Sequence, residues 1–276
     1  MSKTILITGA TDGIGLEAAK LLRTGGHDLL LHGRNEEKLK AISTRLRAFD
    51  GSGRITTYRA DLSTIAETRE LARTILMNEP RLDVLINNAG VFSTGAPRTI
   101  DGLDARFAVN TIAPYILARA FAPLLGKDGR VINLSSAAQS PVEAGALEGQ
   151  LTLSDNGAYS QSKLALTMWN NLLAAAAGDE GPSFVAVNPG SFLASKMVKE
   201  AYGMQGNDLS IGAEILARAA VDAEFGHPAN GRYFDNDRGA FGNPHPDALD
   251  PDKNALIVKR IEAILAGSAK VIAGSS

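Results

Sequence analysis

Short, continuous runs of apolar and β-branched residues recur along the chain, and each is followed by a longer segment of helical periodicity. Because these runs lack an alternation of apolar and polar positions, they are typical of strands covered on both faces in a parallel sheet. The predicted strands cover residues 4–8, 28–32, 54–59, 82–87, 130–134, 184–188 and a short run at 232–234.

The helical patterns between these runs cover residues 14–23, 36–49, 65–78, 101–125 and 158–177. Strict alternation of strand and helix predicts a single α/β domain over residues 1–276. It has a doubly wound, mainly parallel seven-stranded sheet flanked by helices. In such sheets ligands bind beyond the carboxyl ends of the strands, where the strand order reverses. We therefore expect functional residues directly after strands.

Composition removes several classes of protein. The 276 residues carry a formal net charge of −2, with 45% hydrophobic and 21% charged residues, which is an ordinary globular balance. Near-neutral charge and 5% aromatic residues argue against a nucleic-acid partner. The lack of cysteine excludes a disulfide scaffold, a thiolate metal site and a cysteine nucleophile. The histidines show no metal-ligand spacing, so no metal is expected: His27, His32, His227, His245.

Hydropathy gives no sign of targeting or membrane insertion. The first apolar run, residues 4–8, is too short for a signal sequence. No stretch approaches the ~18 uncharged apolar residues that span a bilayer. We therefore expect a cytoplasmic protein without membrane association.

A glycine-rich loop, Gly9-Ala10-Thr11-Asp12-Gly13-Ile14-Gly15, follows the first predicted strand and opens the first helix. Phosphate binding requires bare backbone at a helix amino terminus, where N–H groups and the positive end of the helix dipole attract an anion. The spacing is wider than the usual dinucleotide fingerprint, and a glycine cluster alone is often a plain turn. Its place between strand and helix favours a cofactor site made of Gly9, Thr11, Asp12, Gly13, Ile14 and Gly15.

The residue after the second strand indicates which cofactor this loop serves. An acid there would bind the ribose hydroxyls of NAD, whereas an arginine accommodates the 2′-phosphate of NADP. Arg34 occupies the position, and the first acids, Glu36 and Glu37, suit the first turn of a helix capped by Asn35. The pattern favours NADP over NAD; the alternative is that Arg34 is a solvated surface charge.

Four motifs occur in order: Thr8 to Gly15, Asn87-Asn88-Ala89-Gly90, Tyr159-Ser160-Gln161-Ser162-Lys163 and Asn188-Pro189-Gly190. Together they resemble the short-chain dehydrogenase/reductase (SDR) family, and the long segment before Tyr159 resembles its retinol-dehydrogenase-like branch. The match covers residues 3–194, about seventy per cent of the chain. It implies a Rossmann-like NAD(P)-binding fold, a nicotinamide cofactor and hydride transfer to or from a carbonyl or alcohol carbon.

The resemblance assigns further residues to the cofactor. Asp61 and Leu62 match the pair that borders the adenine ring. The motifs after the fourth and sixth strands line the adenosine half and the nicotinamide respectively: Asn87, Ala89, Gly90; Pro189, Gly190. The threonine that often binds the carboxamide is replaced by alanine at position 194, so we expect Ser195 to make that contact.

Tyr159 and Lys163 carry the expected chemistry. They are four residues apart on one predicted helix, so their side chains share a face. A free tyrosine titrates near 10, and lowering its pKa by about three requires ~4 kcal/mol, which a nearby ammonium supplies only in a partly desolvated cleft. Tyr159 is then the general acid in reduction and the general base in oxidation. The resemblance implies that Lys163 also binds the nicotinamide ribose; taken alone, the pair would be ordinary surface residues.

Two polar residues complete the expected catalytic set. By the resemblance, Ser136 binds the substrate oxygen, and Asn110 joins a proton relay through a bound water. Asn110 alone would instead indicate a helix kink or a buried hydrogen bond. Ser136 precedes Tyr159 by 23 positions, where about thirteen is usual, so residues 137–157 contain an insertion. Ser140, on that insertion, is the alternative to Ser136.

Substrate-side elements are expected at about 137–157 and 191–250. Methionine and aromatic residues within 191–208 favour an apolar substrate, and this segment forms either a mobile lid or a packed amphipathic helix. His245, between two prolines, is expected to be a structural loop residue.

We therefore expect an NADP-dependent oxidoreductase that acts on a small-molecule carbonyl or a primary or secondary alcohol. One alternative is a non-catalytic NAD(P)-sensing regulatory protein, which would not need the proton-transfer residues. Another is an epimerase or dehydratase, which usually carries a larger carboxyl-terminal domain. Two copies could pair as a homodimer through helices 101–125 and 158–177, although the insertion and tail could equally leave a monomer.

Overall fold

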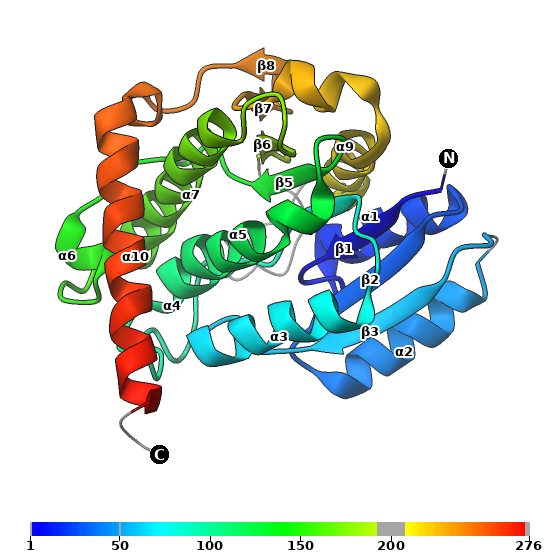
Figure 1. Cartoon of the computed structure of the whole chain (residues 1–276), viewed down its shortest axis with the longest axis horizontal. Coiled ribbons are helices and arrows are strands. Elements are labelled where there is room, and N and C mark those ends of the chain that lie inside the picture. Colours follow the sequence, from blue (N-terminus) through cyan, green and yellow to red (C-terminus); the bar gives the residue numbers. More distant parts are fainter. Residues whose placement is uncertain (1, 50, 192–207, 274–276) are drawn as a thin grey trace.

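One sheet of eight strands forms the centre of the computed structural model, which describes residues 2–49, 51–191 and 208–273 (Figure 1). The strand order is β3-β2-β1-β4-β5-β6-β7-β8. All neighbours pair in parallel except β7 and β8. The strands are β1 (Thr4–Ile7), β2 (Asp28–Gly33), β3 (Ile55–Arg59), β4 (Val84–Asn87), β5 (Arg130–Leu134), β6 (Ser183–Asn188), β7 (Tyr233–Asp235) and β8 (Ala240–Gly242).

The α/β class and the doubly wound sheet are confirmed, with one strand more than the seven expected. The additional strand, β8, is three residues long and mostly exposed, so it leaves no apolar run in the sequence. It pairs antiparallel with β7 and forms the edge of the sheet.

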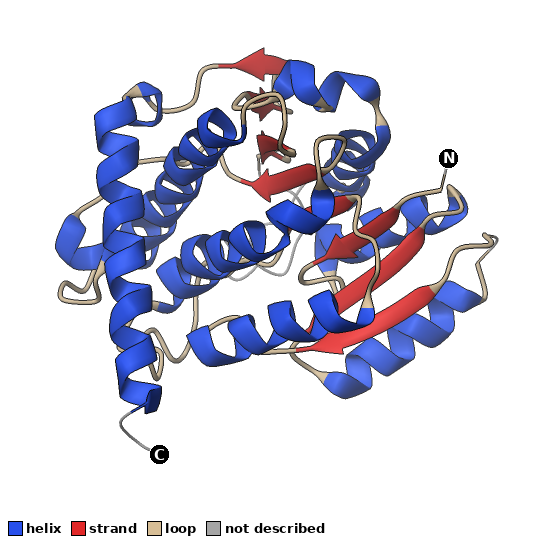
Figure 2. Cartoon of the chain, in the orientation of Figure 1, coloured by secondary structure: helices blue, strands red, loops and turns tan. Residues whose placement is uncertain are grey.

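Helices connect the strands and cover both faces of the sheet (Figure 2). The α-helices are α1 (Gly13–Thr24), α2 (Glu36–Arg47), α3 (Ile65–Asn78), α4 (Ala105–Phe107), α5 (Ala113–Leu125), α6 (Ala144–Leu147), α7 (Asp155–Ala177), α9 (Leu209–Val221) and α10 (Pro251–Ala273). Short helical turns of other types are η1 (Ala108–Ile112), η2 (Ala223–Phe225), η3 (His227–Ala229) and η4 (Pro246–Leu249).

One buried hydrophobic cluster lies on each face of the sheet. Leu6, Leu30 and Leu85 point toward α3, α5 and α7, and they belong to one cluster. Their strand neighbours, such as Ile5 and Leu29, belong to the other cluster, together with residues of α1, α2 and α9. Because successive strand side chains point to opposite faces, strands buried on both faces need the continuous apolar runs seen in the sequence.

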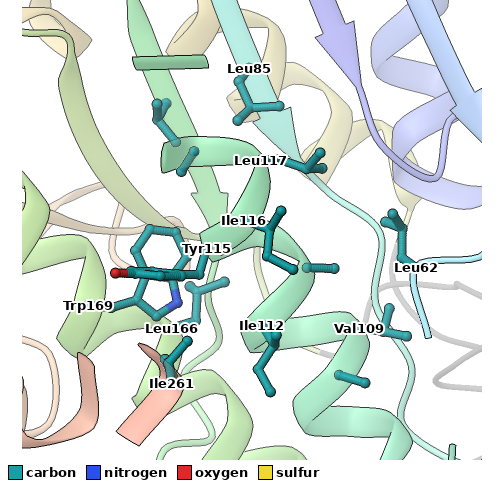
Figure 3. Close-up of a cluster of buried hydrophobic side chains, with 14 of the residues drawn as sticks. Leu62, Leu85, Val109, Ile112, Tyr115, Ile116, Leu117, Leu166, Trp169 and Ile261 are labelled. Carbon is teal, nitrogen blue, oxygen red and sulfur yellow. The ribbon is translucent and has the colours of Figure 1, made fainter. Parts of the chain in front are cut away.

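The core beneath α5 and α7 contains the largest buried side chain, Trp169 (Figure 3). Its ring lies edge-on to Tyr115, with the ring centroids 5.7 Å apart, and its Nε1 donates to Thr111 O at 3.2 Å. Ile261 of α10 is fully buried in the same cluster. These contacts attach α10 to the helices of this face.

Helix α10 crosses the outer side of this helical layer, a feature that the hydrophobic pattern did not predict (Figure 1). Its Glu262 pairs with Tyr115 and Arg119 of α5, and its Leu265 O accepts from Arg69 of α3 at 2.8 Å. Pro251 begins the helix, where its fixed φ suits the first turn.

The segment Ala105–Leu125 is long and apolar enough to cross a membrane by length and composition alone. In the fold, 72% of its most apolar 18-residue stretch is buried inside the protein, as in the core helix of a globular domain. The segment comprises α4, the π-helical turn η1 and α5. A π turn inside a helix is frequently found at a functional site, and η1 contains Asn110.

Candidate active site

A cavity of about 460 Å³ runs along the carboxyl ends of β2, β1, β4, β5 and β6, which are neighbours in that order. A hollow of about 540 Å³ between β3 and α3 contains none of the residues singled out from the sequence. Most of the predicted site residues line the first cavity: Gly9, Thr11, Asp12, Gly13, Ile14, Arg34, Asp61, Leu62, Ala89, Gly90, Tyr159, Lys163 and Pro189.

The glycine loop between β1 and α1 has the close backbone approach that requires glycine. Gly9 has φ +66°, and a Cβ built on it would lie 2.9 Å from the Ala89 Cα. Gly15 does not line the cavity, but a Cβ there would overlap the side chain of Asn88. These glycines therefore let the β1 loop, the β4 loop and α1 pack together at the cavity.

The amino terminus of α1 borders the cavity, which Asp12, Gly13 and Ile14 line. Asp12 is the N-cap, and its Oδ1 accepts from Gly13 N at 2.8 Å. The next N–H groups, those of Ile14 and Gly15, belong to the first turn, where no intrahelical acceptor exists. The helix end is therefore suited to an anion.

Two basic residues stand at the β2 end of the cavity. Arg34 is exposed and lines it, as does Lys38, which sequence reasoning missed. Asn35 accepts from Lys38 N at 2.9 Å, so the cap of α2 places Lys38 in the first turn beside Arg34. The sequence could have indicated Lys38, because an N-cap at Asn35 places Lys38 in the first turn of the helix that follows.

His32 is a buried histidine beneath this end of the cavity. Its Nδ1 accepts from Gly9 N at 3.3 Å, and its Nε2 lies 3.1 Å from Ala60 O, to which it donates as a neutral ring. Burial lowers its pKa to about 4, so the ring is neutral at pH 7. His32 thus ties the glycine loop to the end of β3, a role that metal-ligand spacing could not reveal.

Asn88 lines the cavity, whereas Asn87, the residue expected to line the cofactor, does not. Asn87 Nδ2 donates to Asn133 Oδ1 at 2.8 Å, on the α5 side of the sheet. Asn88 Nδ2 donates to Thr8 O at 2.9 Å and to Gly9 O at 3.2 Å. Adjacent residues at a strand end point in opposite directions, so a shift of one position moves the side chain out of the site.

Tyr159 and Lys163 lie on α7 at the other end of the cavity. Lys163 Nζ donates to Leu134 O at 2.6 Å and lies 5.7 Å from the centroid of the Tyr159 ring. Burial lowers the pKa of Lys163 to about 8. The Phe92 ring packs against Tyr159 with centroids 5.1 Å apart. The Tyr159 phenol and the desolvated Lys163 ammonium therefore lie together at this end of the cavity.

Asn110 is fully buried, and its side chain holds the loop after β4. Its Oδ1 accepts from Val91 N at 2.8 Å, while its Nδ2 donates to Val91 O at 2.9 Å and to Ser162 Oγ at 3.0 Å. The side chain thus forms buried hydrogen bonds, as in the simpler of the two interpretations, and it does not line the cavity.

Ser136 follows β5, and its backbone is fixed from two sides. Its carbonyl accepts from Tyr233 Oη at 3.1 Å and from Gln139 Nε2 at 2.9 Å, while its Oγ accepts from Ala138 N at 3.1 Å. Ser135 lines the cavity, but its hydroxyl is bonded to Thr167 Oγ1 at 2.7 Å. Ser136 itself does not line the cavity.

The loop after β6 is held by the turn after β7. Asn236 Nδ2 donates to Pro189 O at 2.9 Å, and Asp237 accepts from Ser191 N at 2.8 Å. Gly190 has φ +122° and does not line the cavity. The Ser195 contact and nearly all of the segment expected to be a lid or helix lie outside the described residues.

The insertion packs away from the cavity, and no described residue of 137–157 lines it. Glu148 pairs with Arg260 of α10, and Ser140 Oγ lies 2.7 Å from Ser160 Oγ. His245 caps η4 by accepting from Asp247 N at 3.1 Å, which is a structural role. Within the described ranges, no group of three or more His, Asp or Glu could hold a metal ion.

Comparison with known proteins identifies the family. The family model for short chain dehydrogenase matches residues 3–206, so the chain belongs to the short-chain dehydrogenase family of oxidoreductases. Retinol dehydrogenase 13 of Mus musculus is 32% identical over 193 residues, which are 68% of this chain and 58% of that protein. Retinol dehydrogenase 12 of Mus musculus is 31% identical over 245 residues, covering 84% of this chain and 77% of that protein.

A solved structure agrees with this assignment. The crystal structure of a short chain dehydrogenase from Burkholderia cenocepacia J2315 in complex with NADP has a TM-score of 0.68 and 26% identity, over 86% of this chain and 97% of that chain. The expected family, its retinol-dehydrogenase-like branch and the Rossmann-like fold are therefore confirmed. The chain spans 58% of the length of retinol dehydrogenase 13.

Proposed function

We propose that the protein is an NADP-dependent oxidoreductase that transfers hydride between nicotinamide and an apolar carbonyl or alcohol carbon. The observation that carries this proposal is one continuous cavity with Arg34 and Lys38 at one end and Tyr159 and Lys163 at the other. A basic end suits a phosphate, and a half-buried phenol beside a buried ammonium suits proton transfer.

The residues present fit a nicotinamide dinucleotide. The bare glycine loop and the first turn of α1 suit the pyrophosphate, because a side chain at Gly9 would collide with Ala89. Arg34 and Lys38 would neutralise the 2′-phosphate that distinguishes NADP from NAD. When bound, the cofactor supplies or accepts the hydride. NADP in the Burkholderia relative supports this choice.

Tyr159 is the proposed proton donor in reduction and acceptor in oxidation. Its ring lies 5.7 Å from a Lys163 ammonium that has lost its water, where a charge acts more strongly than in solvent. An ammonium at this position favours the phenolate over the neutral phenol. Ser136 is the proposed partner of the substrate oxygen. Asn110 is proposed to complete the proton relay.

The substrate end of the cavity is proposed to accept an apolar carbonyl or alcohol. Val91 lines the cavity, and the ring of the next residue, Phe92, packs against the Tyr159 ring. These side chains offer few hydrogen bonds to a polar substrate. The similarity to retinol dehydrogenases 12 and 13 supports an apolar alcohol or aldehyde.

Replacement of Tyr159 by phenylalanine tests the proposal. A panel of aldehydes, ketones and alcohols is screened by nicotinamide fluorescence with NADPH, NADH and their oxidised forms. Wild-type protein should turn over at least one compound, faster with the NADP pair. Tyr159→Phe should keep NADPH binding and lose at least about a hundredfold in kcat. Turnover by Tyr159→Phe at the wild-type rate contradicts the role of the phenol.

A further inference from the structure

Arg106, on the short helix α4, is a buried cation that no part of the proposed chemistry uses. Its side chain is 1% exposed. Its Nε and one terminal nitrogen hold the Asp104 carboxylate at 2.8 and 2.6 Å, and the other terminal nitrogen pairs with Asp155. That second nitrogen also lies 3.4 Å from Phe92 O. Burying a guanidinium is costly unless its donors are satisfied, and here they converge on two other segments.

Both segments lead to Tyr159. Asp155 begins α7, four residues before Tyr159, so the two side chains lie on one face of that helix. Phe92 packs its ring against the Tyr159 ring, with centroids 5.1 Å apart. Arg106 therefore touches the start of the helix that carries Tyr159 and the backbone of the residue that covers it.

Asn110, four residues after Arg106, grips the same loop and the same helix. It binds both backbone groups of Val91, the residue before Phe92, and it donates to Ser162 on α7. The segment α4–η1 is thus joined to α7 on both sides of Tyr159, at Asp155 and at Ser162. One contact before Tyr159 and one after it fix how the helical turn that carries Tyr159 is rotated and where it lies along the helix axis.

We propose that Arg106 is a positioning residue for Tyr159: by holding the Asp155 carboxylate and the Phe92 carbonyl together, it sets where the Tyr159 ring stands in the cavity. This inference rests on the proposed function. A positioned acid must lie within hydrogen-bond reach of its proton acceptor, and displacement by ~1 Å costs roughly a hundredfold in rate.

The double variant Arg106→Met/Asp104→Asn tests this role, because it removes the guanidinium without leaving the buried Asp104 charge unpaired. We expect kcat to fall by about ten- to a hundredfold, with the Kd for NADPH within about twofold of wild type. Arg106→Lys, which keeps the charge but not the planar fork, should recover part of kcat. If the double variant does not fold, Asp155→Asn keeps the Arg106–Asp104 pair and should show a smaller loss.

A second readout needs no turnover. The ultraviolet titration of the Tyr159 phenol, obtained as the difference from Tyr159→Phe in each background, reports how well Lys163 stabilises the phenolate. We expect the Tyr159 midpoint to rise by about half a pH unit or more in the double variant or in Asp155→Asn. A wild type without any turnover contradicts the proposed function, and this titration still tests Arg106.

Arg54→Met is the matched control, because it breaks a distant ion pair with the buried Glu79. It should lower the free energy of unfolding without changing kcat or the Tyr159 titration. If the Arg106 variants behave like Arg54→Met, losing stability while both readouts stay at wild-type values, Arg106 is a structural residue and the inference is wrong.

Discussion

Replacement of Lys163 by methionine should make the protein more stable at neutral pH. Burial lowers the pKa of Lys163 from 10.5 to about 8, so the native state holds this proton less tightly than the unfolded chain. At about 1.4 kcal/mol for each pH unit, the charged side chain costs the native state about 3 kcal/mol at pH 7. The cost disappears as the pH rises from 8 to 10.5, because Lys163 is then neutral in both states.

Urea unfolding of wild type and Lys163→Met between pH 7 and pH 10.5 measures this cost. The difference in free energy of unfolding should move by about 3 kcal/mol in favour of wild type over that range. Methionine also loses the 2.6 Å hydrogen bond to Leu134 O, a pH-independent offset of about 1 kcal/mol. A difference that stays constant with pH would refute the reasoning, since it would mean that the ammonium is not desolvated.

Two further predictions concern the β2 end of the cavity. Arg34→Ala should weaken NADPH binding by about tenfold or more while NADH binding stays within about twofold, because only NADPH carries the 2′-phosphate; equal losses in a fluorescence titration would mean that Arg34 does not bind it. His32→Gln keeps an acceptor for Gly9 N and a donor for Ala60 O but does not titrate. Since the pKa of His32 falls from 6.5 to about 4 on folding, wild type should lose about 2 kcal/mol relative to the variant between pH 7 and pH 5 in urea unfolding, and parallel curves would contradict this.

Much of the fold could be predicted because local pattern and tertiary environment agree. The helix predicted for residues 65–78 is α3 with the same bounds, and the strand predicted for 130–134 is β5. Helix α10 could not be placed in this way, because its partners Arg69, Tyr115 and Glu148 are distant in sequence. Its attachment is a property of tertiary packing.

The residues of the candidate site fall into the same two groups, those that local pattern locates and those that depend on tertiary packing. Residues whose role depends on backbone shape and order along the chain, such as Gly9 and Tyr159, could be located from motifs. The roles of His32, Lys38 and Arg106 depend on which neighbours the fold brings to them. Arg106 meets Asp155 across 49 positions of sequence, and no spacing rule connects the two.

The course of α10 bears on how two copies of the chain could associate. Helix α10 packs against the outward sides of α5 and α7, the two helices through which a homodimer could form. Its Ile261 is buried in the core, and its Glu262 is hydrogen-bonded to Tyr115. A neighbouring molecule that approaches from that direction meets the carboxyl-terminal helix of this chain before it reaches α5. Pairing there would require α10 to detach or to serve as the contact surface itself.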